Sequence, residues 1–220
     1  MRLLLIRHGQ TPSNVLGLLD TAHPGPGLTA VGTAQAAAVP GSLRVHSTEA
    51  IFASTLIRTQ LTAAPLAAAR DLPVQVLPGL HEIEAGALEG LSDRDSVRKY
   101  METVFAWVHG DLSAAMPGAA NGQVFLDRFD ADIAHIAATT QTAVVFSHGA
   151  SIRLWTAMRA INVPPMFTAH NDLDNTGIAE LTGSPEDGWT LQSYAGQPFG
   201  GSGLADPAAS DPMGHAVDSV

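Results

Sequence analysis

The sequence contains no cysteine and few basic residues. Without cysteine the chain can form no disulfide, use no thiolate as a nucleophile and offer no thiolate ligand to a metal. Its 11 lysines and arginines are outnumbered by 21 aspartates and glutamates, which leaves a formal net charge of −10. This balance argues against nucleic acid or an anionic membrane as a partner, although a local group of arginines can still form a positive pocket for a small anion.

Long hydrophobic runs are also absent. No apolar stretch is long enough to cross a bilayer, and no basic and apolar leader precedes the first candidate strand. We therefore expect a cytoplasmic protein with no membrane partner. The 45% of hydrophobic residues is enough for the core of one domain, which we predict over residues 1–195. Residues 196–220 are mostly Gly, Pro, Ser, Ala and Asp, and we predict a disordered tail there.

Apolar runs of strand length alternate with helical segments along most of the chain, which predicts an α/β fold around a parallel sheet. Residues 12–27 contain several prolines and glycines and are predicted to form a loop. Strands are predicted at 3–6, 50–54, 74–77 and 142–147, an antiparallel pair at 178–181 and 189–192, and helices at 28–36, 55–64, 92–109, 124–139 and 150–160. Pro40 and Gly41 are expected to end the first helix.

The most informative stretch is the first predicted strand, whose apolar run ends in Arg7, His8 and Gly9. Arginine suits a phosphate-like anion, and a neutral imidazole can act as nucleophile or base. Glycine after the histidine is expected to let a substrate oxyanion approach the backbone. The strand at 142–147 repeats the pattern with His148 and Gly149. Since parallel strands end at one edge of a sheet, we expect the two imidazoles to lie side by side there.

Further candidates lie between these two strands. Arg58 falls in the first turn of a predicted helix, where free N–H groups also favour an anion, although a solvated helix arginine is the plainer interpretation. Glu82 and Glu84 stand in a segment rich in carboxylates. Residues 86–122 are mixed in polarity and are predicted to form a partly exposed cap.

Taken in order, these motifs resemble those of the histidine phosphatase superfamily, also called the phosphoglycerate mutase-like family, over most of the chain. The resemblance implies a three-layer sandwich, with a mostly parallel central sheet and helices on both faces. The matching segments are Arg7-His8-Gly9 with Asn14, then residues 28–36, 54–63, 82–90 and 147–149.

The resemblance implies a phosphomonoester hydrolase that acts on a small phosphorylated substrate without a metal or another cofactor. His8 would attack phosphorus to form a phosphohistidine. Glu82 would protonate the leaving group and then activate water, with Glu84 as the rival for this role. The phosphate oxygens would be held by Arg7, Asn14, Arg58 and His148.

Several alternatives remain open. A phosphoglycerate mutase would need further basic residues in an enclosing cap, and residues 86–122 offer only Arg94, Arg98 and Lys99. A metal-dependent hydrolase lacks paired ligand spacing in this sequence. A non-catalytic phospho-ligand-binding protein would not need a retained catalytic set. An edge strand could also pair two copies as a homodimer, and structural roles are expected for Glu89 and Arg153.

Overall fold

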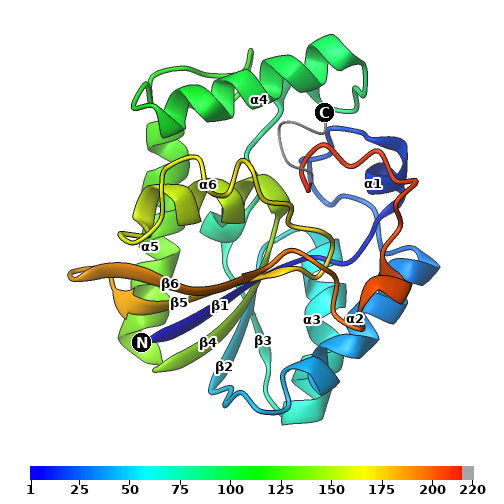
Figure 1. Cartoon of the computed structure of the whole chain (residues 1–220), viewed down its shortest axis with the longest axis vertical. Coiled ribbons are helices and arrows are strands. Elements are labelled where there is room, and N and C mark those ends of the chain that lie inside the picture. Colours follow the sequence, from blue (N-terminus) through cyan, green and yellow to red (C-terminus); the bar gives the residue numbers. More distant parts are fainter. Residues whose placement is uncertain (215–220) are drawn as a thin grey trace.

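The computed structural model describes residues 1–214 and arranges six strands in one sheet in the order β3-β2-β4-β1-β5-β6 (Figure 1). The parallel strands are β1 (Arg2–Arg7), β2 (Ala50–Ala53), β3 (Val74–Val76) and β4 (Thr142–Ser147). Two antiparallel strands, β5 (Ile178–Ser184) and β6 (Gly188–Ala195), complete one edge. The mostly parallel sheet inferred from the strand and helix alternation is confirmed.

Six α-helices accompany the sheet in residues 1–214. They are α1 (Pro12–Leu16), α2 (Ala30–Ser42), α3 (Ile57–Arg70), α4 (Arg94–Val108), α5 (Gly122–Thr139) and α6 (Gly149–Arg159). Short 3₁₀ turns lie at Pro78–Leu80, Gly86–Leu88 and Ser202–Leu204. None of the helices in this part of the chain combines the length and the apolar character needed to cross a bilayer.

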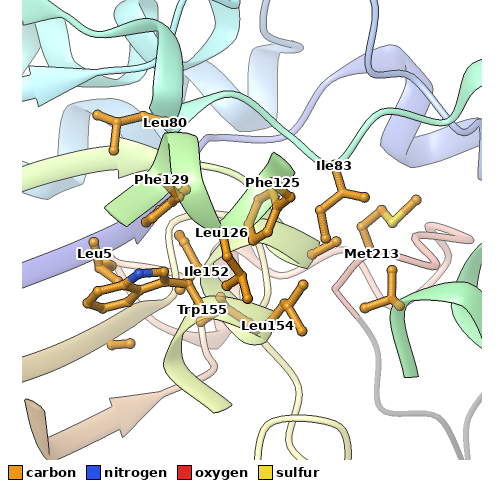
Figure 2. Close-up of a cluster of buried hydrophobic side chains, with 14 of the residues drawn as sticks. Leu5, Leu80, Ile83, Phe125, Leu126, Phe129, Ile152, Leu154, Trp155 and Met213 are labelled. Carbon is orange, nitrogen blue, oxygen red and sulfur yellow. The ribbon is translucent and has the colours of Figure 1, made fainter. Parts of the chain in front are cut away.

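The sheet is covered by helices on both faces, so the expected three-layer sandwich is confirmed. Side chains of β1 alternate between the faces, and Leu4 and Ile6 pack with the apolar residues of α2 and α3. On the other face, Leu5 packs with Phe129 of α5 and Trp155 of α6 (Figure 2). The buried Tyr100, Val104 and Trp107 attach α4 to this second cluster. Figure 1 places α4 at the top of the molecule, beyond the sheet edge.

Two local features differ from the sequence prediction. Part of the predicted loop forms α1, because the Thr11 and Asn14 side chains each accept a hydrogen bond from the other residue's backbone N–H and so cap the helix. Pro at the first position also suits a helix start. Pro40 does not end α2, which continues to Ser42. A proline near the end of a helix removes only one late hydrogen bond.

The C-terminal segment from residue 196 differs more from its prediction, which was a disordered tail. Residues 196–214 follow a defined path past α2 and α1, drawn in orange and red in Figure 1, whereas residues 215–220 of the predicted disordered tail lie outside the described residues. The side chain of Gln35 donates to the carbonyl of Leu204, and the side chain of Gln10 donates to Asp206. These polar contacts hold a segment that has little apolar surface to bury, which is why its composition predicted disorder.

Gly32 in α2 permits a close approach that sets the position of the turn after β1. A Cβ atom on Gly32 would lie 2.1 Å from the carbonyl oxygen of Gln10. We expect Gly32→Ala to lower the free energy of unfolding by about 1–3 kcal/mol, measured by urea denaturation, because the turn must shift to admit a methyl group. Gly41→Ala in the same helix is the matched control, since a Cβ there meets nothing within 4 Å. Equal stability of the two variants would contradict this account.

Candidate active site

His8 and His148 follow adjacent parallel strands at the same level. Arg7 at the end of β1 pairs with Ser147 at the end of β4, and the backbone N–H of His8 donates to the Ser147 carbonyl. The two imidazole rings lie edge to face, with centroids 5.3 Å apart. The structure therefore brings both histidines to one edge of the sheet, in the arrangement that parallel pairing predicts.

The hydrogen bonding of His8 defines its tautomer. Its Nδ1 lies 2.8 Å from the carbonyl oxygen of Gly9, which can only accept, so Nδ1 carries the proton. Nε2 of the neutral ring is thus left with a free lone pair. Burial lowers the pKa of His8 well below its usual value, and the nearby guanidinium groups of Arg58 and Arg7 lower it further. His8 is therefore a neutral imidazole with one nitrogen available as a nucleophile.

His148 is completely buried and is held differently. Its Nε2 lies 2.6 Å from the hydroxyl of Ser54, which also contacts the hydroxyl of Thr59. Its Nδ1 has no hydrogen-bond partner among the residues described. Burial lowers the pKa of His148 well below its usual value, and the charge of Arg58 adds to this effect. Ser54 could not have been identified as a partner from the sequence, because it follows β2 and lies 94 residues from His148 in the chain.

Two buried guanidinium groups face a small cavity next to His8. The Nε of Arg7 and the Nε and Nη1 of Arg58 have no hydrogen-bond partner within residues 1–214, although both side chains are almost fully buried. Nη2 of Arg58 donates to the carbonyl of Asp20. A cavity of about 20 Å³ is lined by Arg7, His8, Thr11, Ser13, Asn14, Leu18, Asp20, Thr21, Arg58, Glu82 and Met213. Unsatisfied guanidinium N–H groups in such a cavity favour an anion.

Glu82 lines the same cavity and is 3% exposed. Its Oε1 accepts hydrogen bonds from the backbone N–H of Ile83 and from both the N–H and the hydroxyl of Ser151. Its Oε2 accepts one 3.2 Å hydrogen bond from the N–H of Ala150. The carboxylate thus lies at the N-terminus of α6, where the helix dipole favours negative charge. Glu84, in contrast, is exposed and does not line the cavity.

Arg128 of α5 supports the loop that carries Glu82. Its guanidinium donates to the carbonyls of Gly79, His81 and Glu82 at 2.6–2.7 Å. Sequence reasoning missed this residue. The helical pattern around Arg128 predicts α5 but carries no information about which loop the side chain reaches.

The side chain of Asn14 accepts hydrogen bonds through its oxygen and donates one through its nitrogen. Its carbonyl oxygen accepts hydrogen bonds from Thr11 and from the side-chain amide of Asn175. Its Nδ2 donates to Asp211, which also forms an ion pair with Arg7. Asp211 was missed as well, because it lies in the segment predicted to be disordered.

Gly9 has a different role from the one expected. A Cβ atom at Gly9 would lie 2.7 Å from the carbonyl oxygen of Gly32. The space beside this glycine is therefore taken by the backbone of α2 and not by a substrate oxyanion. The backbone N–H of Gly9 donates to the hydroxyl of Thr62, which also fixes the turn.

The other residues singled out in the sequence have structural contacts. Glu89 accepts hydrogen bonds from the loop at Thr21 and Ala22. Arg153 is buried, where its guanidinium donates to the carbonyls of Thr168 and Ala169. No group of three or more histidine, aspartate or glutamate side chains in the described chain is placed to hold a metal ion.

The lowered histidine pKa values predict a specific pH dependence. Imidazoles in the unfolded chain titrate near 6.5, whereas His8 and His148 stay neutral to well below that pH in the folded chain. The unfolded state therefore binds more protons below pH 6.5, and the free energy of unfolding should fall as pH decreases through this range. Urea denaturation between pH 7.5 and about pH 5 measures the effect. Stability that rose on acidification would contradict the buried, neutral state of these rings.

Comparison with known proteins agrees with this geometry. Residues 3–196 match the histidine phosphatase superfamily (branch 1). The PE-PGRS family protein PE_PGRS11 of Mycobacterium tuberculosis is 42% identical over 216 residues, which cover 90% of this chain but 37% of that protein. The adenosylcobalamin/alpha-ribazole phosphatase of Escherichia coli is 36% identical over 177 residues, which cover 79% of this chain and 86% of that enzyme.

The fold agrees with a solved relative. The crystal structure of the alpha-ribazole phosphatase from Shigella flexneri superposes with a TM-score of 0.70 at 31% identity, over 89% of this chain and 96% of that one. This chain thus spans little more than a third of PE_PGRS11 but most of the length of the two phosphatases. With both the family match and these relatives covering most of its residues, the chain belongs to branch 1 of the histidine phosphatase superfamily and is an enzyme of the phosphatase class.

Proposed function

We propose that this protein hydrolyses small phosphomonoesters through a phosphohistidine on His8. In the first step Nε2 of His8 forms a bond to phosphorus while the bond to the leaving oxygen breaks, and Glu82 gives that oxygen a proton. In the second step Glu82 takes a proton from water, the hydroxide forms a bond to phosphorus, and the phosphorus–nitrogen bond breaks. Phosphate and neutral His8 are the products, so atoms and charges balance.

One observation carries the proposal. The neutral His8 ring keeps a free lone pair on Nε2 while it lines a cavity with two buried guanidinium groups, Arg7 and Arg58, that have unsatisfied N–H groups. Positive charge fixed in a buried site stabilises the spread negative charge of a phosphoryl transition state. Asn14 adds a neutral donor on the same cavity. His148 does not line this cavity, but its ring lies 5.3 Å from that of His8 and its Nδ1 has no hydrogen-bond partner among the described residues, which makes Nδ1 the atom that would bind a phosphate oxygen.

The hydrogen bonds of Glu82 support its choice over Glu84. Oε1 accepts three hydrogen bonds and is saturated, whereas Oε2 accepts a single long one from Ala150. Oε2 is thus the oxygen with a lone pair available for the transferred proton. Glu84 is exposed, and its own contact is a 3.4 Å hydrogen bond from the N–H of Ala120 in the predicted cap.

The cap favours hydrolysis over mutase chemistry. Its three cations, Arg94, Arg98 and Lys99, are all exposed on α4, and Arg98 pairs with Asp95 and Glu102 on the same helix. None of the three lines the cavity beside His8. A mutase must retain a phosphorylated acid during turnover, and these cations do not face the site to hold one.

A substrate panel tests the proposal. The named relatives make a phosphate ester of alpha-ribazole the first compound to assay, beside sugar phosphates, nucleotides and 3-phosphoglycerate. We expect release of inorganic phosphate from at least one member, and no conversion of 3-phosphoglycerate to its isomer. Phosphate binding without turnover on every member would favour the non-catalytic alternative. Activity in EDTA tests the expected independence of metals, while the cytoplasmic location and the homodimer stay predictions.

A further inference from the structure

The carboxylate of Asp211 contacts the two side chains that the proposed mechanism assigns to phosphate oxygens. Its Oδ2 lies 2.5 Å from Nη2 of Arg7, and its Oδ1 accepts a 3.3 Å hydrogen bond from Nδ2 of Asn14. Carboxylates and phosphoryl groups both present paired anionic oxygens to a guanidinium. Asp211 is 5% exposed, so this contact is made in a buried environment and not at the surface.

Residues 211–214 form a tight turn pressed against Arg7. The backbone N–H of Gly214 donates to the carbonyl of Asp211, and all four residues are buried. A Cβ atom on Gly214 would lie 2.1 Å from Nη1 of Arg7. On the other side, a Cβ atom on Gly149 would lie 2.5 Å from the carbonyl oxygen of Met213. The turn therefore fills the space between the Arg7 guanidinium and the start of α6.

With the turn in place, the cavity is too small for a phosphoryl group. Its volume of about 20 Å³ exceeds only slightly the 10–15 Å³ that one water molecule needs, and Met213 forms part of its wall. A bound phosphate would also stand close to the Asp211 carboxylate, and two like charges at short range in a buried site repel strongly. A phosphate that bound Nη2 of Arg7 and Nδ2 of Asn14 would therefore have to take the two donors that Asp211 now occupies.

Contacts outside the Arg7 site also hold the turn. Met213 lies at the margin of the apolar cluster beneath α6 (Figure 2). The carbonyl of Gly214 accepts a hydrogen bond from the N–H of Leu173, and the carbonyl of Met213 accepts one from Arg153. Because the turn is covalently attached to the domain, its effective concentration at the site is high, and a free phosphate must compete against it.

We propose that residues 211–214 are a built-in competitor of the substrate phosphate, with Asp211 as the anion that binds Arg7 and Asn14 in the resting enzyme. This inference rests on the proposed function, because it takes these two residues as phosphate ligands. Release of the turn precedes phosphate binding, so the tail lowers the apparent affinity for every phosphomonoester.

Asp211→Asn tests the inference in the full chain, since the amide keeps the shape of the side chain and removes its charge. We expect the Kd for inorganic phosphate, measured by calorimetry, to fall by about 10-fold or more, which corresponds to about 1.4 kcal/mol. The KM for a phosphomonoester should fall in parallel, with kcat little changed. Asp187→Asn is the matched control, because Asp187 is exposed in the β5–β6 turn and the change in net charge is the same.

A rise in the Kd for phosphate, in place of the expected fall, would identify a different role for Asp211. Weaker phosphate binding by Asp211→Asn would mean that Asp211 orients Arg7 for the substrate, and unchanged binding would mean that the turn does not compete; either result overturns the inference and leaves the proposed function intact. Phosphate binding by neither protein would overturn both. Hydrogen exchange needs no variant. In the unmodified chain, phosphate should accelerate exchange of the amides in residues 205–214, and slower exchange would overturn the inference.

Discussion

Replacing His8 by alanine is expected to abolish the phosphoenzyme and to lower kcat by about 10⁴-fold or more, because the methyl side chain of alanine has no nucleophilic atom. The unmodified enzyme, quenched during turnover of a ³²P-labelled phosphomonoester, should carry label that is lost in acid and stable in base. The variant should carry none. Inorganic phosphate should still bind to it, since Arg7, Arg58 and Asn14 are unchanged and the small side chain leaves the cavity open.

His135→Ala is the control for this experiment, because His135 is exposed on α5 and lies outside the cavity. It should retain the phosphoenzyme and full activity. Label that persisted in His8→Ala would assign the nucleophile to another residue. Loss of phosphate binding together with activity would instead indicate that the site had collapsed, which a thermal melt of the variant would detect.

Replacing Glu82 by glutamine should slow the first step according to the leaving group. An alkyl phosphate leaves as a strongly basic alkoxide that needs the proton, and loss of a general acid costs about 10²–10⁴-fold. Nitrophenyl phosphate has a weakly basic leaving group and should form the phosphoenzyme at nearly the normal rate. Single-turnover measurements isolate this step from the later attack of water, in which Glu82 also takes part.

Glu84→Gln gives the matched control, because the same chemical change is made two residues away on an exposed side chain. It should affect neither substrate. Equal losses on alkyl and nitrophenyl phosphates in Glu82→Gln would remove the acid role from Glu82. Since the Glu82 carboxylate also caps α6 through Ala150 and Ser151, the melting temperature of the variant must be compared first.

The local sequence around Arg58 predicts its place on a helix but does not predict whether its side chain is buried. Its position in the first turn of a helix predicted an anion-facing arginine, while its residue type alone suggested a solvated one. The structure buries the side chain beside the Asp20 carboxylate, with Nε and Nη1 left without hydrogen-bond partners among the described residues. Burial of an arginine depends on what covers it, here the loop at Asp20 that lies 38 residues away. No feature of the helix itself carries that information.

The sequence by itself determined the sheet edge and its two histidines. Apolar runs that end abruptly in His8-Gly9 and His148-Gly149 predict strands of one sheet, and parallel pairing then leaves little freedom in where the rings lie. Only the tertiary structure decided which carboxylate enters the cavity and which anion meets Arg7. Glu82 is held in the cavity by hydrogen bonds from the N-terminus of α6, which lies 68 residues later in the chain. Asp211 contacts Arg7, from which it is separated by 204 residues. Such contacts form because the packed core brings distant segments together, and hydrogen bonds between them leave no periodic trace in either segment.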